Sequence, residues 1–164
     1  YEDSAMIGRF IYRFILITIA TYAGRTLLAP LTILGWDIDI GILAVVLIGL
    51  SVSGEGTILW GAYSGFIIDC LNPQWMGAGI GARATAALFI SAMRGKLNID
   101  HPVLIGFVIF VASLIDRFIY LSLSSYNAQI FYALWRFIIP SALYNAIFAV
   151  VVIEIYRIIR LFAK

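Results

Sequence analysis

The sequence predicts an all-α, polytopic membrane protein, a single bundle of about six transmembrane helices with very little chain outside the bilayer. Three observations predict this fold class. Of the 164 residues, 63% are hydrophobic and only 12% are charged, whereas a soluble domain is about half apolar and a quarter charged. The mean hydropathy is +1.01. Long apolar runs alternate with short polar turns along the whole chain.

The remaining composition excludes several classes of function. The net charge is only +2 and the basic residues are scattered, so we expect no nucleic-acid partner. A single cysteine, Cys70, rules out an intramolecular disulfide, and a single histidine, His101, excludes a histidine-rich metal site. The first apolar run continues well past the about 7–15 residues of a signal-peptide core, so we expect it to stay in the membrane.

The first three helices are predicted from apolar runs, each compared with the about 20 residues that cross a bilayer. The first covers about 7–34, is interrupted by Gly24-Arg25 and Pro30, and ends in the polar stretch 35–39. The apolar run 40–71 is broken at 51–56 by serine, glycine and glutamate. It can form one kinked helix or two short antiparallel helices. We favour the hairpin, with helices at about 40–52 and 57–71, because these residues form a strong turn signal.

The second half is divided by three polar segments. Pro73 blocks helix continuation after the third helix, and the fourth covers about 77–93. The loop 94–101 is the largest polar loop. Pro102 suits the first turn of the fifth helix, which ends at about 123. The sixth covers about 130–159, and we expect Pro140 to kink it. The whole chain, 1–164, is therefore predicted to form a single transmembrane domain.

The distribution of positive charge predicts the orientation. With six helices, both termini and the basic loop at 94–96 lie on one side, which then holds seven basic residues: Arg9, Arg13, Arg94, Lys96, Arg157, Arg160 and Lys164. The opposite loops hold no lysine or arginine and only the acidic residues Asp37 and Asp39. This positive-inside pattern places both termini in the cytoplasm, and it supports the hairpin, because a fused helix would break the asymmetry.

Several ionisable residues lie inside the predicted helices, mostly at one depth in the outer half. They are Arg25, Asp69, Arg83, Asp116, Arg117 and Arg136. Such groups are costly in a membrane and normally face the bundle interior or a partner. They can form an internal ion-pair network that fixes helix register, or a polar cavity open to the outer side that holds an anionic or zwitterionic ligand. Some of the arginines can also snorkel to the headgroups. Four arginines against two aspartates predict an excess of positive charge.

Small residues form a second pattern, on the third and fourth helices. Gly61 and Gly65 share one helix face with Asp69, and Gly77 and Gly81 share a face of the next helix. Such faces allow helix backbones to approach closely in a membrane. We expect the two helices to pack against each other through these glycines; the alternative is a contact with a foreign transmembrane helix.

Catalytic motifs are absent from the sequence. No serine or histidine lies at a recognisable catalytic spacing, and the glycine-rich stretch 77–81 lacks the residues of a phosphate-binding loop. We therefore expect no enzymatic activity, no cofactor and no metal site.

The order of several motifs resembles the rod shape-determining protein MreD family. The resemblance covers about residues 36–156 and includes Asp39 before the second helix, a Gly61-x-x-x-Gly65-x-x-x-Asp69 helix and a Pro140-x-x-Leu-x-Asn145 motif. The helix start at 76–77 and the basic loop at 94–96 also match. One position departs: the family's proline before the aspartate is Ile38 here, which leaves the start of the second helix less sharply defined.

The resemblance implies a role in bacterial cell-wall elongation. Members of this family reside in the bacterial cytoplasmic membrane, bind the bitopic protein MreC, and act with RodA, its penicillin-binding transpeptidase and, indirectly, the MreB filament to maintain cell shape. The family is also similar to the substrate-binding subunits of energy-coupling-factor transporters, which are six-helix bundles with an outward pocket. The expectation is thus a non-enzymatic scaffold in contact with membrane lipids. A solute-binding transporter subunit and a membrane enzyme acting on lipid-linked precursors remain alternatives.

Overall fold

A computed structural model describes residues 2–26, 37–94, 101–124 and 130–162, and in these ranges the ordered elements are all helical. In chain order they are α1 (Glu2–Thr26), α2 (Ile40–Gly49), α3 (Gly54–Leu71), η2 (Pro73–Trp75), α4 (Ala78–Met93), α5 (Pro102–Leu123), α6 (Ile130–Ala133), η4 (Leu134–Ile138) and α7 (Ile139–Phe162). The all-α prediction is correct for the described residues.

The apolar run 40–71 forms two helices, as the hairpin interpretation predicts. The helix α2 ends at Gly49, earlier than expected, and α3 already begins at Gly54. The hydroxyl of Thr57 on α3 donates to the carbonyl of Gly49 at 3.1 Å. On the far side of the turn, Arg94 donates to the carbonyl of Val52. Side chains from α3 and from the residue after α4 thus satisfy two carbonyl groups at this turn.

Two other helix ends differ from the prediction. The helix α1 begins at Glu2 rather than near residue 7 and is described to Thr26, so the expected break at Pro30 and the end near 34 lie outside the described residues. The helix α4 begins at Ala78 because Gly77 has a φ of 97° and a left-handed conformation that ends the preceding turn.

The last helical stretch is continuous in α6, η4 and α7, and it extends to Phe162 rather than to about 159. The segment η4 is π-helical, and it ends two residues before Pro140. A proline in a helix lacks an N–H group, and its ring crowds the carbonyl four residues earlier. The wider π turn lies at that position, so the irregularity expected from Pro140 precedes the proline as a π-bulge.

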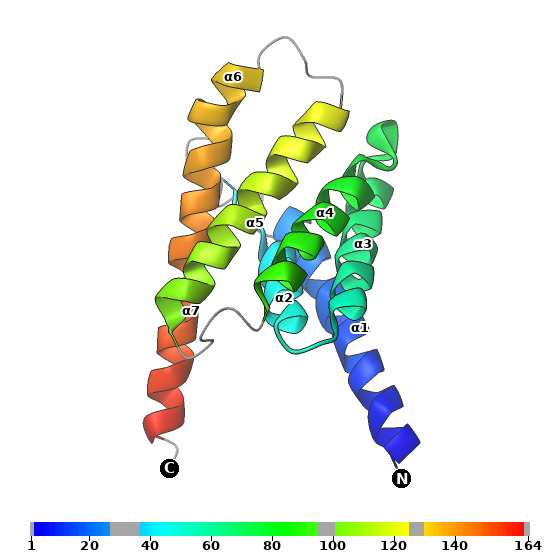
Figure 1. Cartoon of the computed structure of the whole chain (residues 1–164), viewed down its shortest axis with the longest axis vertical. Coiled ribbons are helices and arrows are strands. Elements are labelled where there is room, and N and C mark those ends of the chain that lie inside the picture. Colours follow the sequence, from blue (N-terminus) through cyan, green and yellow to red (C-terminus); the bar gives the residue numbers. More distant parts are fainter. Residues whose placement is uncertain (1, 27–36, 95–100, 125–129, 163–164) are drawn as a thin grey trace.

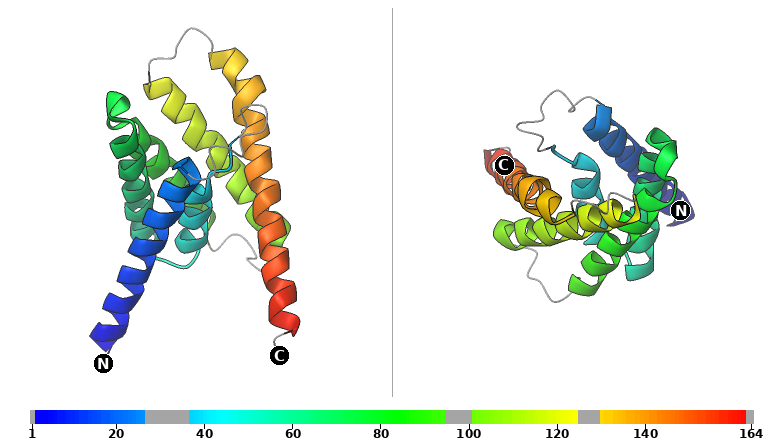
Figure 2. Two further views of the ribbon diagram at one scale, coloured as in Figure 1. Left: turned by 180° about the vertical axis from the view of Figure 1, so that it is seen from behind. Right: turned by 90° about the horizontal axis from the view of Figure 1, so that it is seen from above.

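The helices form a bundle that opens toward one end (Figure 1). The start of α1 and the end of α7 lie at this end and diverge there, and α2 lies between these two helices when the molecule is seen from above (Figure 2). Among the described residues, three segments are long and apolar enough to cross a membrane: Met6–Thr26, Pro102–Leu123 and Leu134–Ile155. The helices α2 and α4 are apolar but shorter. These features are compatible with a membrane protein.

The apolar core has two parts, and α2 belongs to both. The larger part joins α2, α4, α5 and α7 through residues such as Val46, Ile90 and Ile109. The smaller part joins α1, α2 and α3 through Ile17, Ala44 and Trp60. Since α2 is apolar on every side and almost wholly buried, it is the central helix on which the others pack.

A buried ion-pair network as the candidate functional site

The side chain of Arg83 lies at the centre of the bundle and is completely buried. Its Nε donates to Asp116 Oδ1 on α5 at 3.0 Å, and its Nη1 donates to Ser64 Oγ on α3 at 3.0 Å. Its Nη2 donates to Asp39 Oδ2, just before α2. Thr21 on α1 extends this chain, because its hydroxyl lies 3.0 Å from that of Ser64. The guanidinium group on α4 thus bonds directly to α3, α5 and the residue before α2, and it reaches α1 through Ser64. All three of its nitrogen atoms have acceptors, which offsets the cost of its burial.

Asp39 carries the second part of the network. Its carboxylate accepts from the backbone N–H of Ile42 at 3.2 Å and so caps the start of α2. Its own backbone N–H donates to Asn145 Oδ1 on α7 at 2.9 Å. Arg25 Nη2 on α1 lies 3.7 Å from Asp39 Oδ2. Burial raises the pKa of the Asp39 carboxyl, but Arg83 and Arg25 lower it by more, so its pKa lies well below the ordinary value.

The backbone beside Asp39 leaves no room for a side chain at Gly41. A Cβ atom there would lie 2.8 Å from Thr21 Oγ1 and 3.0 Å from Arg83 Nη1. Both are atoms of the network, and neither can move without losing a hydrogen bond. Glycine at this position therefore lets α2 approach α1 and Arg83 closely.

A second ion pair lies beside the first and is partly exposed. Arg117 Nη2 on α5 is 2.6 Å from Asp37 Oδ1. Ser141 on α7 accepts from the Asp37 backbone N–H at 3.2 Å and donates to Asp37 Oδ1 at the same distance. Burial raises the pKa of Asp37, and Arg117 more than offsets this, so the net shift is downward. This pair ties α5 and α7 to the segment before α2.

The network is balanced in formal charge. It contains three arginines and three aspartates, which are Arg25, Arg83, Arg117, Asp37, Asp39 and Asp116. The predicted excess of positive charge is therefore wrong. Sequence reasoning placed Asp37 and Asp39 in an outer loop, but the chain folds back into the bundle at this point and their carboxylates pair with the arginines.

Two residues of the predicted outer polar cluster are not in this network. Asp69 is fully buried, but it accepts from the backbone N–H groups of Gly77, Gly79 and Ile80 at 3.0, 2.7 and 3.0 Å. It therefore serves the start of α4, where a carboxylate satisfies free N–H groups and the helix dipole. Arg136 lies in the π-helical segment with an exposed side chain. The remaining four members, Arg25, Arg83, Asp116 and Arg117, do lie together.

The expected packing of α3 on α4 is present, but not through all four predicted glycines. A Cβ at Gly61 would lie 2.8 Å from the carbonyl oxygen of Arg83, and one at Gly65 would lie 2.7 Å from the Cα of Ile80. Gly79 also lies in this contact. Gly77 has open space around it and serves the turn, whereas Gly81 faces Leu123 of α5. The face of Gly61 and Gly65 is thus occupied within the chain, which excludes these two glycines as a free docking surface.

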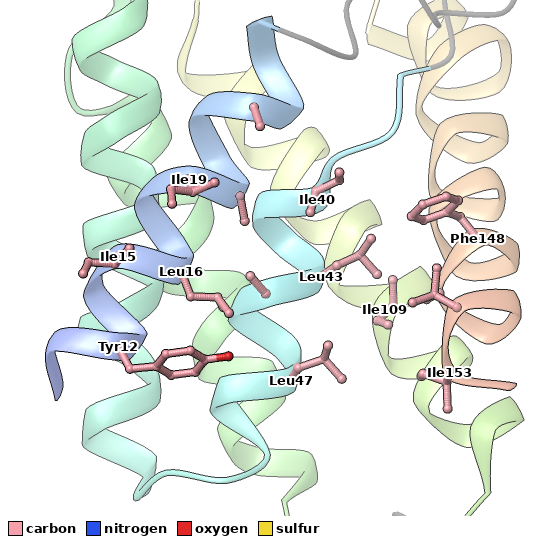
Figure 3. A pocket seen from close by; sticks show the side chains of 15 residues that line it. Tyr12, Ile15, Leu16, Ile19, Ile40, Leu43, Leu47, Ile109, Phe148 and Ile153 are labelled. Carbon is pink, nitrogen blue, oxygen red and sulfur yellow. The ribbon is translucent and has the colours of Figure 1, made fainter. Parts of the chain in front are cut away.

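Two cavities lie outside the network. The first, the lateral groove, has a volume of 570 Å³ and opens between α1 and α7, with α2 as its floor (Figure 3). Its lining is apolar: Tyr12, Ile15, Leu16, Ile19, Ala20 and Ala23 of α1; Ile40, Leu43, Ala44 and Leu47 of α2; Ile109 of α5; and Phe148, Ala149, Val152 and Ile153 of α7.

The second cavity, the end pocket, has a volume of 470 Å³ and lies between η2, the end of α5 and the α6–η4 segment. Aromatic and amide side chains line it, among them Gln74, Trp75, Tyr120 and Tyr132. No residue of the network lines either cavity. Neither of these two cavities is the polar cavity expected at the outer polar cluster, and that cavity stays a prediction.

Sequence reasoning missed three of the four uncharged polar residues that complete the network. Thr21, Ser64, Ser141 and Asn145 join it, and only Asn145 was singled out, from its motif. The available signal was position, because Thr21 precedes Arg25 by one helical turn and Ser141 precedes Asn145 by one turn on a face of α7. A comparison with protein-family models, curated proteins and solved structures finds no significant match to this chain.

Proposed function

We propose that this protein is a non-enzymatic membrane scaffold of the bacterial wall-elongation complex that binds MreC and helps to organise RodA and its transpeptidase. The observation that carries the proposal is the direct contact between two positions of the MreD-like motifs. Asp39 precedes the second helix and Asn145 lies on the last, 106 residues apart, and the backbone N–H of Asp39 donates to Asn145 Oδ1 at 2.9 Å. Two motif residues that are far apart in the sequence thus bind each other where the start of α2 meets α7.

The other motif positions have similar structural roles. Asp69 holds the start of α4, and Pro140 follows the π turn of the last helical stretch. Each of these residues fixes a helix end or a helix contact, and the buried charges satisfy one another within the chain. A bundle whose buried arginines and aspartates form ion pairs with one another favours a scaffold over an enzyme, because a catalytic site needs polar groups that can reach a substrate.

Cysteine cross-linking tests the proposal and also locates the partner. Cys70 is the only cysteine, so Cys70→Ser gives a cysteine-free background. Single cysteines then replace exposed apolar residues on different helices, at Ile19, Leu59, Phe107 and Ile147. They are paired with a cysteine in the transmembrane helix of the MreC protein from the same genome. We expect one helix face to cross-link strongly and the other positions to serve as matched controls. No cross-link at any position, together with no co-purification, would contradict the proposal.

The end pocket favours one second candidate, a solute-binding transporter subunit. Its aromatic walls and amide groups are those of a small-molecule site, and it lies away from the end where the helix termini diverge. Thermal-shift screening against vitamins and lipid headgroups tests this candidate. A stabilising ligand whose effect is lost in Trp75→Ala, but retained in an exposed control such as Leu59→Ala, would favour it over the scaffold.

A further inference from the structure

The lateral groove is an apolar trough with a defined length. Along α1 its lining runs from Tyr12 to Ala23, eleven steps of a helix, or about 17 Å at 1.5 Å per residue. The hydrocarbon core of a bilayer is about 30 Å thick, so one leaflet accounts for about 15 Å. Along α1 the groove is thus about as long as one leaflet is deep. Its linings on α2, from Ile40 to Leu47, and on α7, from Phe148 to Ile153, are shorter, about 11 and about 8 Å at the same rise.

One end of the groove is closed. Its outermost lining residue on α2 is Ile40, and the preceding residue, Asp39, is hydrogen-bonded to Asn145 on α7. Asn145 lies one helical turn before Ala149, which lines the groove. The contact between Asp39 and Asn145 therefore bridges α2 and α7 just beyond the apolar walls. A partner helix long enough to cross a bilayer would meet this bridge, whereas an acyl chain can end below it.

The other end is open, and basic residues follow the groove faces of both walls. On α1, Arg9 continues the stripe of Tyr12, Leu16 and Ile19 at a spacing of three and four residues. Arg13 follows Tyr12 and is half-buried. On α7, Arg157 lies one turn beyond Ile153, with an exposed side chain that is 4.0 Å from Glu154. Guanidinium groups bind phosphate oxygens through paired hydrogen bonds.

We propose that the lateral groove holds an acyl chain of an anionic phospholipid from the leaflet on the side of the helix termini, with its phosphate beside the arginines of the open end. Membrane hydrocarbon solvates an acyl chain as well as the groove does, so the groove provides shape and the arginines provide the preference for an anionic headgroup. At the strength typical of basic residues near anionic lipids, two arginines give a preference on the order of thirty-fold over a zwitterionic lipid.

Native mass spectrometry of the intact protein, released from nanodiscs of equal parts phosphatidylglycerol and phosphatidylcholine, tests the proposal. We expect one retained phosphatidylglycerol molecule. Leu47→Trp places a bulky ring on the groove floor, where Leu47 is 46% exposed, and should abolish retention. Leu59→Trp is the matched control, because Leu59 is an exposed leucine of α3 outside the groove, and it should leave retention unchanged.

The charge preference is tested separately. Arg9→Gln with Arg157→Gln should reduce the ratio of phosphatidylglycerol to phosphatidylcholine toward one, whereas Arg136→Gln in η4 should not. Lipid retention that is equal in Leu47→Trp and Leu59→Trp would overturn the proposal. A second result would also overturn it: a Leu47→Trp protein that retains lipid as the wild type does but no longer cross-links to MreC. The groove would then hold a helix of the partner rather than a lipid. A loss of lipid with intact MreC cross-linking supports the groove assignment, whatever the outcome for the scaffold.

Discussion

The guanidinium of Arg83 donates to the carboxylate of Asp116 at 3.0 Å, and the side chains of these two residues are 0% and 6% exposed. Arg83 is also bonded to Asp39, so one buried cation lies between two buried anions. The removal of one member of such a group leaves the remaining charges buried without compensation.

Arg83→Met should destabilise the fold by about 3–5 kcal/mol, because Asp39 and Asp116 would then be buried without their cation. The measurement is the unfolding midpoint of the purified protein in detergent. Arg83→Lys should recover only part of the loss, since an ammonium group cannot match the planar geometry that serves three acceptors. Arg157→Gln, at an exposed pair, is the control and should have little effect. An Arg83→Met protein as stable as this control would refute a structural role for the network.

Asn145→Ala should cost about 1–3 kcal/mol, because the backbone N–H of Asp39 would lose its acceptor in a buried position. Hydrogen exchange measures the effect directly, as faster exchange at Asp39 and in the first turn of α2. Leu143→Ala, at an exposed site on the same helix, provides the comparison. Unchanged protection at Asp39 would mean that this bond does not hold α2 to α7.

Asp69→Ala should weaken the start of α4 by about 1–2 kcal/mol, the range for the loss of a helix N-cap. Three backbone N–H groups would lose their acceptor. Exchange should accelerate at residues 77–80 while the end of α4 near Met93 stays protected. Equal acceleration along the whole helix would instead indicate global unfolding.

Replacing glycine by alanine should change the stability in opposite directions at two positions. Gly65→Ala should destabilise by about 1–3 kcal/mol, because its methyl group would meet the backbone of Gly79 and Ile80. Gly8→Ala in α1 has open space around it and should stabilise by about 0.5–1 kcal/mol, since alanine has the higher helix propensity. Unfolding midpoints of the two variants provide the test, and a stabilising Gly65→Ala would contradict close packing of α3 on α4.

The ion pair of Asp37 and Arg117 predicts a loss of stability only in acid. The folded-state pKa of Asp37 is lowered from about 3.8, so its contribution is complete above that pH and is lost as the pH falls from there through the lower folded value. The difference in unfolding midpoint between the wild type and Asp37→Asn should therefore be constant from pH 7 to pH 5 and shrink below pH 4. A difference that already shrinks between pH 7 and pH 5 would contradict the downward shift.

The helices could be predicted because hydropathy and turn residues are local signals. The break between α2 and α3 followed from serine, glycine and glutamate at 51–56, and the start of α5 from Pro102. The depth of these charged residues could also be predicted, since the helical rise of 1.5 Å per residue places Arg83 and Asp116 at similar heights. The ion-pair partner of each charged residue could not be predicted. Asp39 lies 44 residues from Arg83, and only the fold brings them together.

Asp69 shows a different limit of sequence reasoning. Its register on α3 was correct, and its burial was expected from its depth. Its partners, however, are backbone N–H groups, which every residue carries and which leave no mark in a sequence. The π turn before Pro140 was hidden for a similar reason, because proline indicates a disturbance of the helix but not how the preceding backbone adapts.

The long separation between Asp39 and its partners bears on biogenesis. Translation delivers the Asp39 carboxylate to the membrane 44 residues before Arg83, its principal cation, and 106 residues before Asn145. An incomplete nascent chain therefore holds an acidic group with only Arg25, 3.7 Å away in the folded protein, to balance it before Arg83 emerges. Charge is poorly tolerated in lipid, so in a membrane we expect α2 and the turn before it to be stable only once α4 and α7 have emerged. We therefore expect assembly to be completed by the last helix rather than to proceed helix by helix.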